Sequence, residues 1–238
     1  MSSFLDSLYL PSSDEPQGVI PWAKSPEQTA QDLANGVARV GGHRAADYGQ
    51  AYLLAANTLF LAARTNGTLD HHGLPIFFLQ RHAAELLMKA PLQLAIDIQD
   101  AREEANQLRP PFPTARQRQR AQRSHRLAAL LEDLDAMVVA MQVCAVPVAL
   151  RNAVQQIIGV EEDPTWSRYS YRVEKVDGVC RFARHMDREF VLPLAQIQEL
   201  LQTANVALGT IWPTFEGQLM GELGALWEQA ARAVGMFD

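Results

Sequence analysis

Apolar residues recur every three or four positions along most of the chain, the spacing that gathers them on one face of an α-helix. Glycine and proline residues interrupt this pattern at intervals typical of helix ends. The pattern predicts seven helices, at about residues 25–41, 44–64, 74–108, 125–143, 147–158, 188–209 and 214–234. A kink is expected in the third of them at Pro91, because proline lacks the amide hydrogen that the helix would use there.

Local signals support several of these boundaries. The Ser-Pro-Glu tripeptide at residues 25–27 offers an N-cap, a proline for the first helical position and an acid for the first turn. The Asn-Gly pair at residues 66–67 is a stop signal for the second helix. Ser124 is a candidate N-cap for the helix that starts at His125.

The pattern changes between residues 168 and 183. Tyr169, Tyr171 and Val173 alternate with polar residues, and an Asp-Gly pair follows at residues 177–178. Alternation around such a pair is typical of two strands joined by a tight turn. The segment 168–183 is therefore predicted to form a small β-hairpin.

The chain divides into two parts of different character. Residues 1–24 hold three prolines among scattered apolar residues, which predicts an extended arm that docks through Phe4, Leu8, Tyr9 and Trp22. Residues 25–238 show no internal repeat. We therefore expect an all-α fold class, with one helical domain over 25–238 and the hairpin as an insertion.

The composition agrees with a helical globular protein. Alanine occurs 34 times and leucine 29 times, the net charge is −6, and 48% of the residues are hydrophobic. These values exclude a disordered chain and a wholly basic nucleic-acid coat, while they allow a local basic patch. Two cysteines are too few for a disulfide scaffold.

Nothing in the sequence predicts a membrane partner. The N-terminus lacks the basic start and apolar core of a secretion signal. The longest apolar stretch, Met137–Leu150, is too short to span a bilayer. We expect a cytoplasmic protein.

Common catalytic motifs are absent. The sequence has no glycine-rich phosphate loop ending in Lys-Ser/Thr, no Gly-x-Ser-x-Gly and no His-Glu-x-x-His. We expect neither a metal nor a cofactor. The segment Gln80–Lys89 is more informative, because Arg81, Glu85 and Lys89 repeat at i, i+4 and i+8. Glu85 can pair with both bases on one helix face, which fits either a salt-bridged surface or a binding face.

The segment around these residues resembles the HEPN superfamily of prokaryotic helical proteins. Its pattern Q-x-A-A-E-x-x-L-K-A is approximated by Gln80–Ala90, and its H-D-L-x-x-L helix start by His125–Leu131, with Arg126 in place of the aspartate. Arg168–Ser170 lies where many members have Arg-Tyr-Pro. The resemblance covers about residues 50–212 and implies an up-and-down helical bundle.

The resemblance implies a metal-independent endoribonuclease of a defence or toxin–antitoxin system. HEPN ribonucleases use an arginine as a phosphate clamp and a histidine, four to six residues later, as the base for the ribose 2′-hydroxyl. Arg120 and Arg118 precede His125 at this spacing, and Arg64 precedes His71. None of these arginines is followed by the family's usual asparagine, aspartate or histidine. His125, Arg120 and Arg118 are the candidate catalytic residues.

One dense basic run offers a surface for RNA phosphates. Its five arginines are Arg116, Arg118, Arg120, Arg123 and Arg126. Arginine forms two-point contacts with phosphate, and the hairpin residues Arg168 and Tyr169 are candidates for further contacts with RNA. A solvated loop is the alternative interpretation of the run.

Three hypotheses remain open. The first is a HEPN-like protein that binds or cuts RNA. The second is a non-catalytic module that binds a nucleotide, or a partner protein from a neighbouring gene such as a nucleotidyltransferase, through Arg81, Glu85 and Lys89. The third is an unrelated helical protein that buries its Leu and Ala stripes against a twin subunit. A homodimer is also expected from the resemblance, because HEPN proteins often pair their motifs across one cleft.

Overall fold

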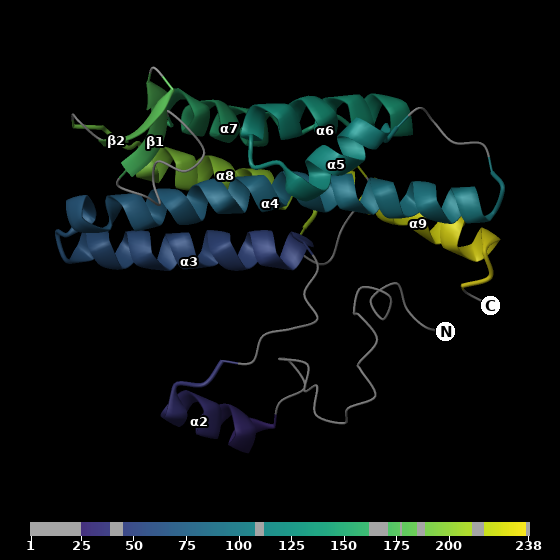
Figure 1. Cartoon of the computed structure of the whole chain (residues 1–238). Coiled ribbons are helices and arrows are strands. Elements are labelled where there is room, and N and C mark those ends of the chain that lie inside the picture. Colours follow the sequence, from purple (N-terminus) through teal and green to yellow (C-terminus); the bar gives the residue numbers. More distant parts are fainter. Residues whose placement is uncertain are drawn as a thin grey trace. The chain divides into compact units, whose positions relative to one another are not determined.

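The computed structural model describes residues 25–38, 45–107, 112–161, 171–176, 178–184, 189–210 and 217–236. Within these ranges it contains eight helices and one two-stranded antiparallel sheet (Figure 1). A mainly helical fold with a small hairpin is thereby confirmed. No helix in the described ranges is long and apolar enough to cross a membrane.

The chain forms two compact units, residues 1–44 with 237–238, and residues 45–236. In the first unit the structure describes helix α2, Pro26–Asn35. Its start agrees with the Ser-Pro-Glu signal. Its end comes earlier than residue 41, because Gly36 takes a left-handed φ of 64° and stops the helix.

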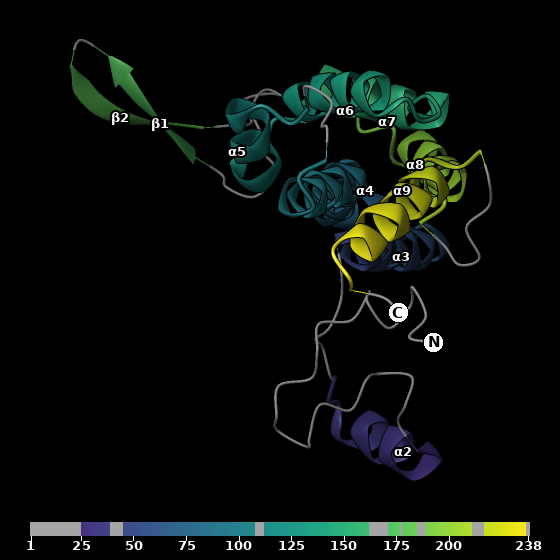
Figure 2. The same ribbon diagram turned by 90° about the vertical axis from the view of Figure 1, so that its right-hand side faces the viewer.

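The second unit is a helical bundle built around one long helix. Its helices are α3 Ala45–Thr65, α4 Leu69–Glu104, α5 Ala115–Arg123, α6 Leu127–Met141, α7 Val148–Val160, α8 Leu194–Leu208 and α9 Leu219–Ala233. Helix α4 packs against each of the other six, and Figure 2 shows it in their midst. The core accordingly lies along α4, where side chains such as Phe77, Leu87 and Ile96 are fully buried, facing Leu130 and Leu134 of α6.

Helix α4 begins at Leu69, five residues before its predicted start at Leu74. The turn from α3 takes only residues 66–68, with Gly67 at a φ of 68°, so no longer loop is needed. The helix is continuous from Leu69 to Glu104 and includes both Pro75 and Pro91.

Four arginines of the run, Arg116 to Arg123, lie in helix α5 and not in a loop, and Arg126 lies in the connection to α6. Thr114 caps this helix: its hydroxyl accepts from the backbone N–H of Gln117 at 3.3 Å, and the Gln117 side chain accepts from the Thr114 N–H at 2.9 Å. This reciprocal pair is a capping box, which satisfies two amides at the helix start. The motif is Thr-x-x-Gln, and it lies between the prolines of residues 110–113 and the arginine run.

Helix α6 starts at Leu127, so Ser124 is not its N-cap. The Ser124 hydroxyl instead accepts a hydrogen bond from the backbone N–H of Arg126 at 3.1 Å. This contact shapes the connection between α5 and α6, and it leaves His125 outside both helices.

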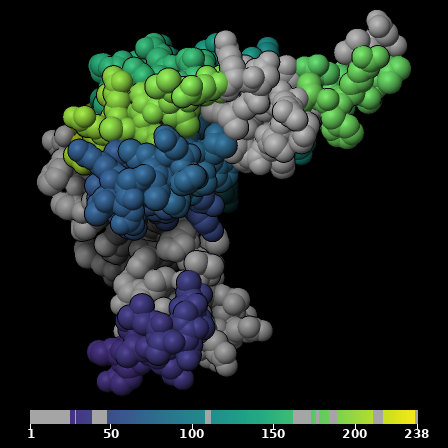
Figure 3. Space-filling view, turned by 90° about the vertical axis from the view of Figure 1, so that its left-hand side faces the viewer, coloured from purple at the N-terminus to yellow at the C-terminus, as the bar shows by residue number. Residues whose placement is uncertain are grey.

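Strands β1, Tyr171–Val176, and β2, Val179–Arg184, form the predicted hairpin. Val173 pairs with Phe182 in its register, and Gly178 takes a φ of 82° at the turn. The side chains of this pair are exposed. Figure 3 draws the two strands in green.

Two later helices start after their predicted positions. Residues 189–193 are not helical, and α8 begins at Leu194 after Pro193. Helix α9 begins at Leu219. The predicted arm at residues 1–24 and the candidates Arg168 and Tyr169 lie outside the described residues.

Candidate functional site

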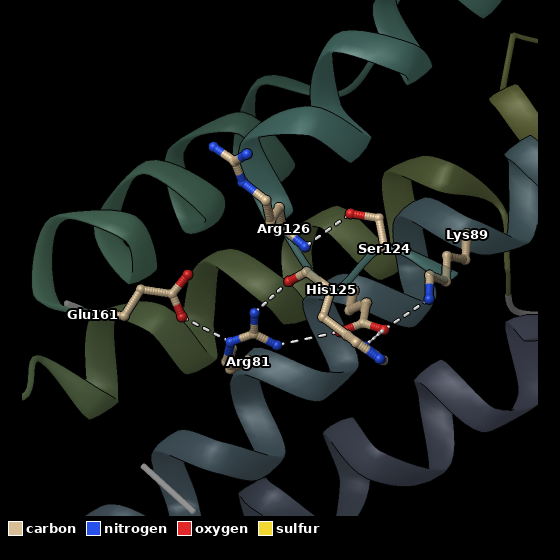
Figure 4. Close-up of polar contacts among 7 residues, drawn as sticks. Arg81, Lys89, Ser124, His125, Arg126 and Glu161 are labelled. Carbon is tan, nitrogen blue, oxygen red and sulfur yellow. Dashed lines mark hydrogen bonds and ion pairs between the residues drawn. The ribbon is translucent and has the colours of Figure 1, made fainter. Parts of the chain in front are cut away.

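Three residues predicted to share a helix face do so in α4, but the face is buried. The side chain of Arg81 is 4% exposed and that of Glu85 is 2% exposed, and Lys89 is largely buried. They join His125 and Glu161 in a polar network that we call the Glu85 cluster (Figure 4). The cluster therefore connects α4 with the start of α6 and the end of α7.

Arg81 is the structural hub of the Glu85 cluster. Its Nε donates to Oε2 of Glu161 at 2.7 Å, and its Nη1 donates to Oε2 of Glu85 at 3.2 Å. Its Nη2 donates to the backbone carbonyl of His125. One buried guanidinium thus ties together three segments that are distant in sequence.

Glu85 receives two further partners at its other oxygen. Nζ of Lys89 and Nδ1 of His125 each lie 2.9 Å from Oε1. Lys89 comes from the next turn of the same helix, whereas His125 comes from the connection between α5 and α6. Both oxygens of this buried carboxylate are therefore occupied.

Charge balance explains how the cluster tolerates burial. The positive charges of Arg81 and Lys89 offset the negative charges of the two carboxylates, Glu85 and Glu161. Burial alone would raise the pKa of the Glu85 carboxyl, but the hydrogen bonds and charges of Lys89 and His125 outweigh it and lower that pKa. Glu85 is consequently an anion at neutral pH.

His125 is the member of the cluster that reaches solvent, because its side chain is 58% exposed. An imidazole that donates its Nδ1–H to a carboxylate carries its lone pair on Nε2. In the described chain, Nε2 of His125 has no hydrogen-bond partner. The arrangement holds the ring at one edge and leaves a basic nitrogen available at the surface, which suits proton transfer.

A second histidine lies close to the cluster without belonging to it. The ring of His82 contacts Tyr52 edge-on at 4.4 Å and stacks on Phe78 at 5.9 Å. Burial lowers the pKa of His82. Glu85 raises this pKa, while the nearby Arg81 and Lys89 lower it further. His82 is therefore neutral at pH 7 and serves the packing of α3 on α4.

The predicted clamp residues are held by carboxylates. Arg118 donates to both oxygens of Asp100, at 2.6 and 2.8 Å, and Arg120 pairs in the same two-point way with the buried Asp133. The hydrogen bonds to Asp100 raise the pKa of Arg118. A phosphate would have to displace these carboxylates, and the structure does not bring either guanidinium to the imidazole of His125.

The other arginines of the run are differently placed. Arg116, Arg123 and Arg126 are exposed. None of the three side chains has an ion-pair partner among the described residues. Figure 4 shows the guanidinium of Arg126 turned away from the imidazole of His125. Part of the basic run is thus neutralised within the protein, and the rest faces solvent.

Several partners in this region could not be found from sequence. Glu161, Asp100 and Asp133 lie 80, 18 and 13 residues from the arginines that they bind. No spacing rule for a helix links residues so far apart. The pattern at Arg81, Glu85 and Lys89 gave the pairing within α4 correctly, but it did not indicate burial.

An open pocket of about 970 Å³ lies apart from this network, between the end of α3, the start of α4 and residues 189–196. None of the predicted site residues lines it. Within the described ranges, no group of three or more His, Cys, Asp or Glu side chains is close enough together to hold a metal ion.

Comparison with known proteins gave no family model, no curated protein and no solved structure that matches the chain significantly. The resemblance to HEPN proteins therefore rests on the sequence motifs themselves.

Proposed function

We propose that this chain is a HEPN-like protein that cuts RNA without a metal ion, with His125 as the general base. The observation that carries the proposal is the pairing of an exposed imidazole with a buried carboxylate: Nδ1 of His125 lies 2.9 Å from Glu85. Such a carboxylate orients the ring and stabilises the imidazolium that forms when the other nitrogen takes a proton.

The chemistry follows from these two residues. Nε2 of His125 takes the proton of a ribose 2′-hydroxyl, and the resulting oxygen attacks the adjacent phosphorus. The bond from phosphorus to the 5′-oxygen breaks, and that oxygen takes a proton from water. The products are a 2′,3′-cyclic phosphate and a 5′-hydroxyl. Lys89 shares the oxygen of Glu85 with His125 and helps to keep that carboxylate ionised, so that it can hold the imidazole.

RNA binding is assigned to the arginines that have no ion-pair partner among the described residues. Arg116, Arg123 and Arg126 are exposed on α5 and the connection to α6. Because Arg126 points away from the imidazole, it would contact a neighbouring phosphate and not the one that reacts. These contacts would hold the strand across the site in a salt-dependent way.

The competing hypothesis of a binding module on Arg81, Glu85 and Lys89 receives less support. Arg81 and Glu85 are almost completely buried, and each is bound to partners within the protein. A partner protein or nucleotide could reach this face only after the Glu85 cluster had been dismantled.

The test is an RNA cleavage assay with purified protein in EDTA, using tRNA and poly-U. We expect products with cyclic phosphate ends, and loss of cleavage in His125→Ala. The matched control is His71→Ala, which removes an exposed histidine from the first turns of helix α4 and leaves the cluster intact. Circular dichroism verifies that both variants fold.

Two outcomes would overturn the proposal. One is intact RNA after incubation with the wild-type protein. The other is cleavage by His125→Ala at the wild-type rate, which would identify the activity as a contaminant or assign it to other residues.

A further inference from the structure

The hairpin of β1 and β2 carries exposed apolar side chains in the described structure. Phe182 on β2 is 81% exposed, and its register partner Val173 on β1 is 62% exposed. Among the described elements, the two strands pack on each other, and neither forms a substantial contact with a helix. A sheet of two strands has no second layer of its own to bury such side chains. Within the described residues, Phe182 therefore contributes to no core.

The register places these side chains on one face of the hairpin. In an antiparallel sheet, directly opposed residues share a face, and so do the pairs two positions further along each strand. Val173 and Phe182 form one such pair, and Lys175 and Cys180 form the pair two positions nearer the turn. All four residues are exposed. We call them the Phe182 face.

The two faces of the hairpin differ in charge. On the opposite face Arg181 stands level with Glu174, so a positive charge is balanced by a negative one. On the Phe182 face Lys175 stands level with Cys180, and its ammonium has no ion-pair partner among the described residues. Lys175 is a diagonal neighbour of Phe182, at about 7–8 Å, so one ligand can contact both side chains. The Phe182 face thus combines an aromatic ring with an unbalanced positive charge.

This combination fits a ligand that has flat rings and negative charge. Residues 171–184 include four basic and two acidic residues, whereas the whole chain has a net charge of −6. The hairpin is therefore a positive element of an acidic protein, which favours an anionic partner. Single-stranded nucleic acid supplies both features, because its bases stack on aromatic side chains and its phosphates bind cationic ones.

We infer that the Phe182 face binds single-stranded RNA, with one nucleobase stacked on the ring of Phe182 and a neighbouring phosphate bound by Lys175. The choice of RNA as the natural strand rests on the proposed function, while the stacking contact itself needs no 2′-hydroxyl. Arg116, Arg123 and Arg126 respond to phosphate charge alone. The Phe182 face adds a contact to an unpaired nucleobase, so it selects unpaired segments over a duplex, in which the bases stack on one another.

Fluorescence anisotropy of the full chain with a labelled 2′-deoxythymidine oligonucleotide, in EDTA, measures this contact without cleavage. We expect Phe182→Ala to weaken binding about 5- to 150-fold, the range for loss of one stacked base. Phe182→Tyr should bind like the wild type, because tyrosine retains the ring, whereas Phe182→Leu should bind almost as weakly as Phe182→Ala. Val179→Ala is the matched control, since Val179 is 58% exposed on the other face of the same hairpin.

An abasic strand identifies the nucleobase as the group that Phe182 contacts. This strand keeps the sugar-phosphate backbone and its charge but has no ring to stack, so Phe182→Leu should weaken its binding by less than about twofold. Lys175→Met should reduce the magnitude of the slope of log binding constant against log salt concentration by about 0.7, the value for one phosphate of a single strand. Arg181→Met, which removes a charge from the opposite face, should leave that slope unchanged.

Four results would overturn the inference. They are absence of binding by the wild-type chain, wild-type binding by Phe182→Leu, which would indicate a merely apolar contact, equal weakening of the abasic and complete strands by Phe182→Leu, and weakening by Val179→Ala as large as that by Phe182→Ala. The RNA cleavage assay separates these results from failure of the proposed function. Cleavage without dependence of binding on Phe182 contradicts only the stacking contact, whereas Phe182-dependent binding without cleavage contradicts only the proposed chemistry.

Discussion

Replacing Arg81 with methionine should destabilise the protein far more than the same change at Arg118. Both arginines bind carboxylates, but Arg81 is 4% exposed and serves two of them, whereas Arg118 and Asp100 are both partly exposed. Because the substitution is identical, the difference in cost reports the burial of Arg81 together with its larger number of partners.

The magnitudes follow from the surroundings of each residue. Removing one partner of a buried ion pair costs about 3–5 kcal/mol, since the remaining charge is left without compensation. An exposed pair contributes about 0–1 kcal/mol. Loss of Arg81 removes one ion pair from each of Glu85 and Glu161 and the donor to the carbonyl of His125, which places the variant in the upper range. In a unit of this size, the corresponding loss in Tm is about 6–20 °C.

Urea unfolding of both variants, followed by circular dichroism, provides the measurement. The midpoint should fall strongly for Arg81→Met and little for Arg118→Met, with similar slopes. The loss in Arg81→Met should shrink as the pH is lowered towards about 3, because the carboxylates that Arg81 binds then take up protons. Equal losses at the two positions would refute the reasoning, since burial would then have no effect on the cost.

Three further predictions follow from the same contacts. Because the pKa of Glu85 is lowered in the folded state, the ionised carboxylate stabilises the fold above its ordinary pKa of about 4.5, and this effect is lost as the pH falls through the folded pKa. The difference in unfolding free energy between wild type and Glu85→Gln, measured by urea titration at several pH values, should therefore become smaller in acid. A difference that stays constant with pH would contradict this prediction. Replacing Arg116, Arg123 and Arg126 together with alanine should reduce the magnitude of the slope of log binding constant against log salt concentration for single-stranded RNA by about 2, as measured by filter binding. An unchanged slope would show that these arginines do not contact the RNA. Thr114→Ala should cost about 0.5–2 kcal/mol through loss of the capping box of α5, and an unchanged unfolding midpoint would mean that the cap does not stabilise this helix.

Sequence patterns predicted the bundle well where local signals are strong. The second helix, the hairpin around its Asp-Gly pair and the end of α8 at Gly209 all agree with the structure. Most of the errors lie at helix starts, and one lies at the end of α2, which stops at Asn35 and not at residue 41. Helix α5 was missed because its nine residues hold one buried apolar side chain, Ala121, so hydrophobic periodicity gives no signal there. The capping box at Thr114 was the available local signal.

The candidate site was predictable only within single elements. The i, i+4 spacing indicated that Glu85 pairs with Arg81 and Lys89, and the structure confirms both contacts. Spacing could not show that this face is buried, nor that His125 lies on Glu85, 40 residues away in the chain. Tertiary packing decides such contacts, and the partners of Arg118 and Arg120 were hidden for the same reason.

The claim that His125 removes the proton of a ribose 2′-hydroxyl is tested most directly by changing that hydroxyl. Cleavage of one RNA oligonucleotide is compared with cleavage of the same sequence carrying 2′-deoxy sugars throughout, in EDTA and with the wild-type protein. The account predicts that the RNA is cut to products with 2′,3′-cyclic phosphate ends, while the deoxy strand stays intact although it binds. Equal cleavage of both strands, or cleavage of neither, would contradict it.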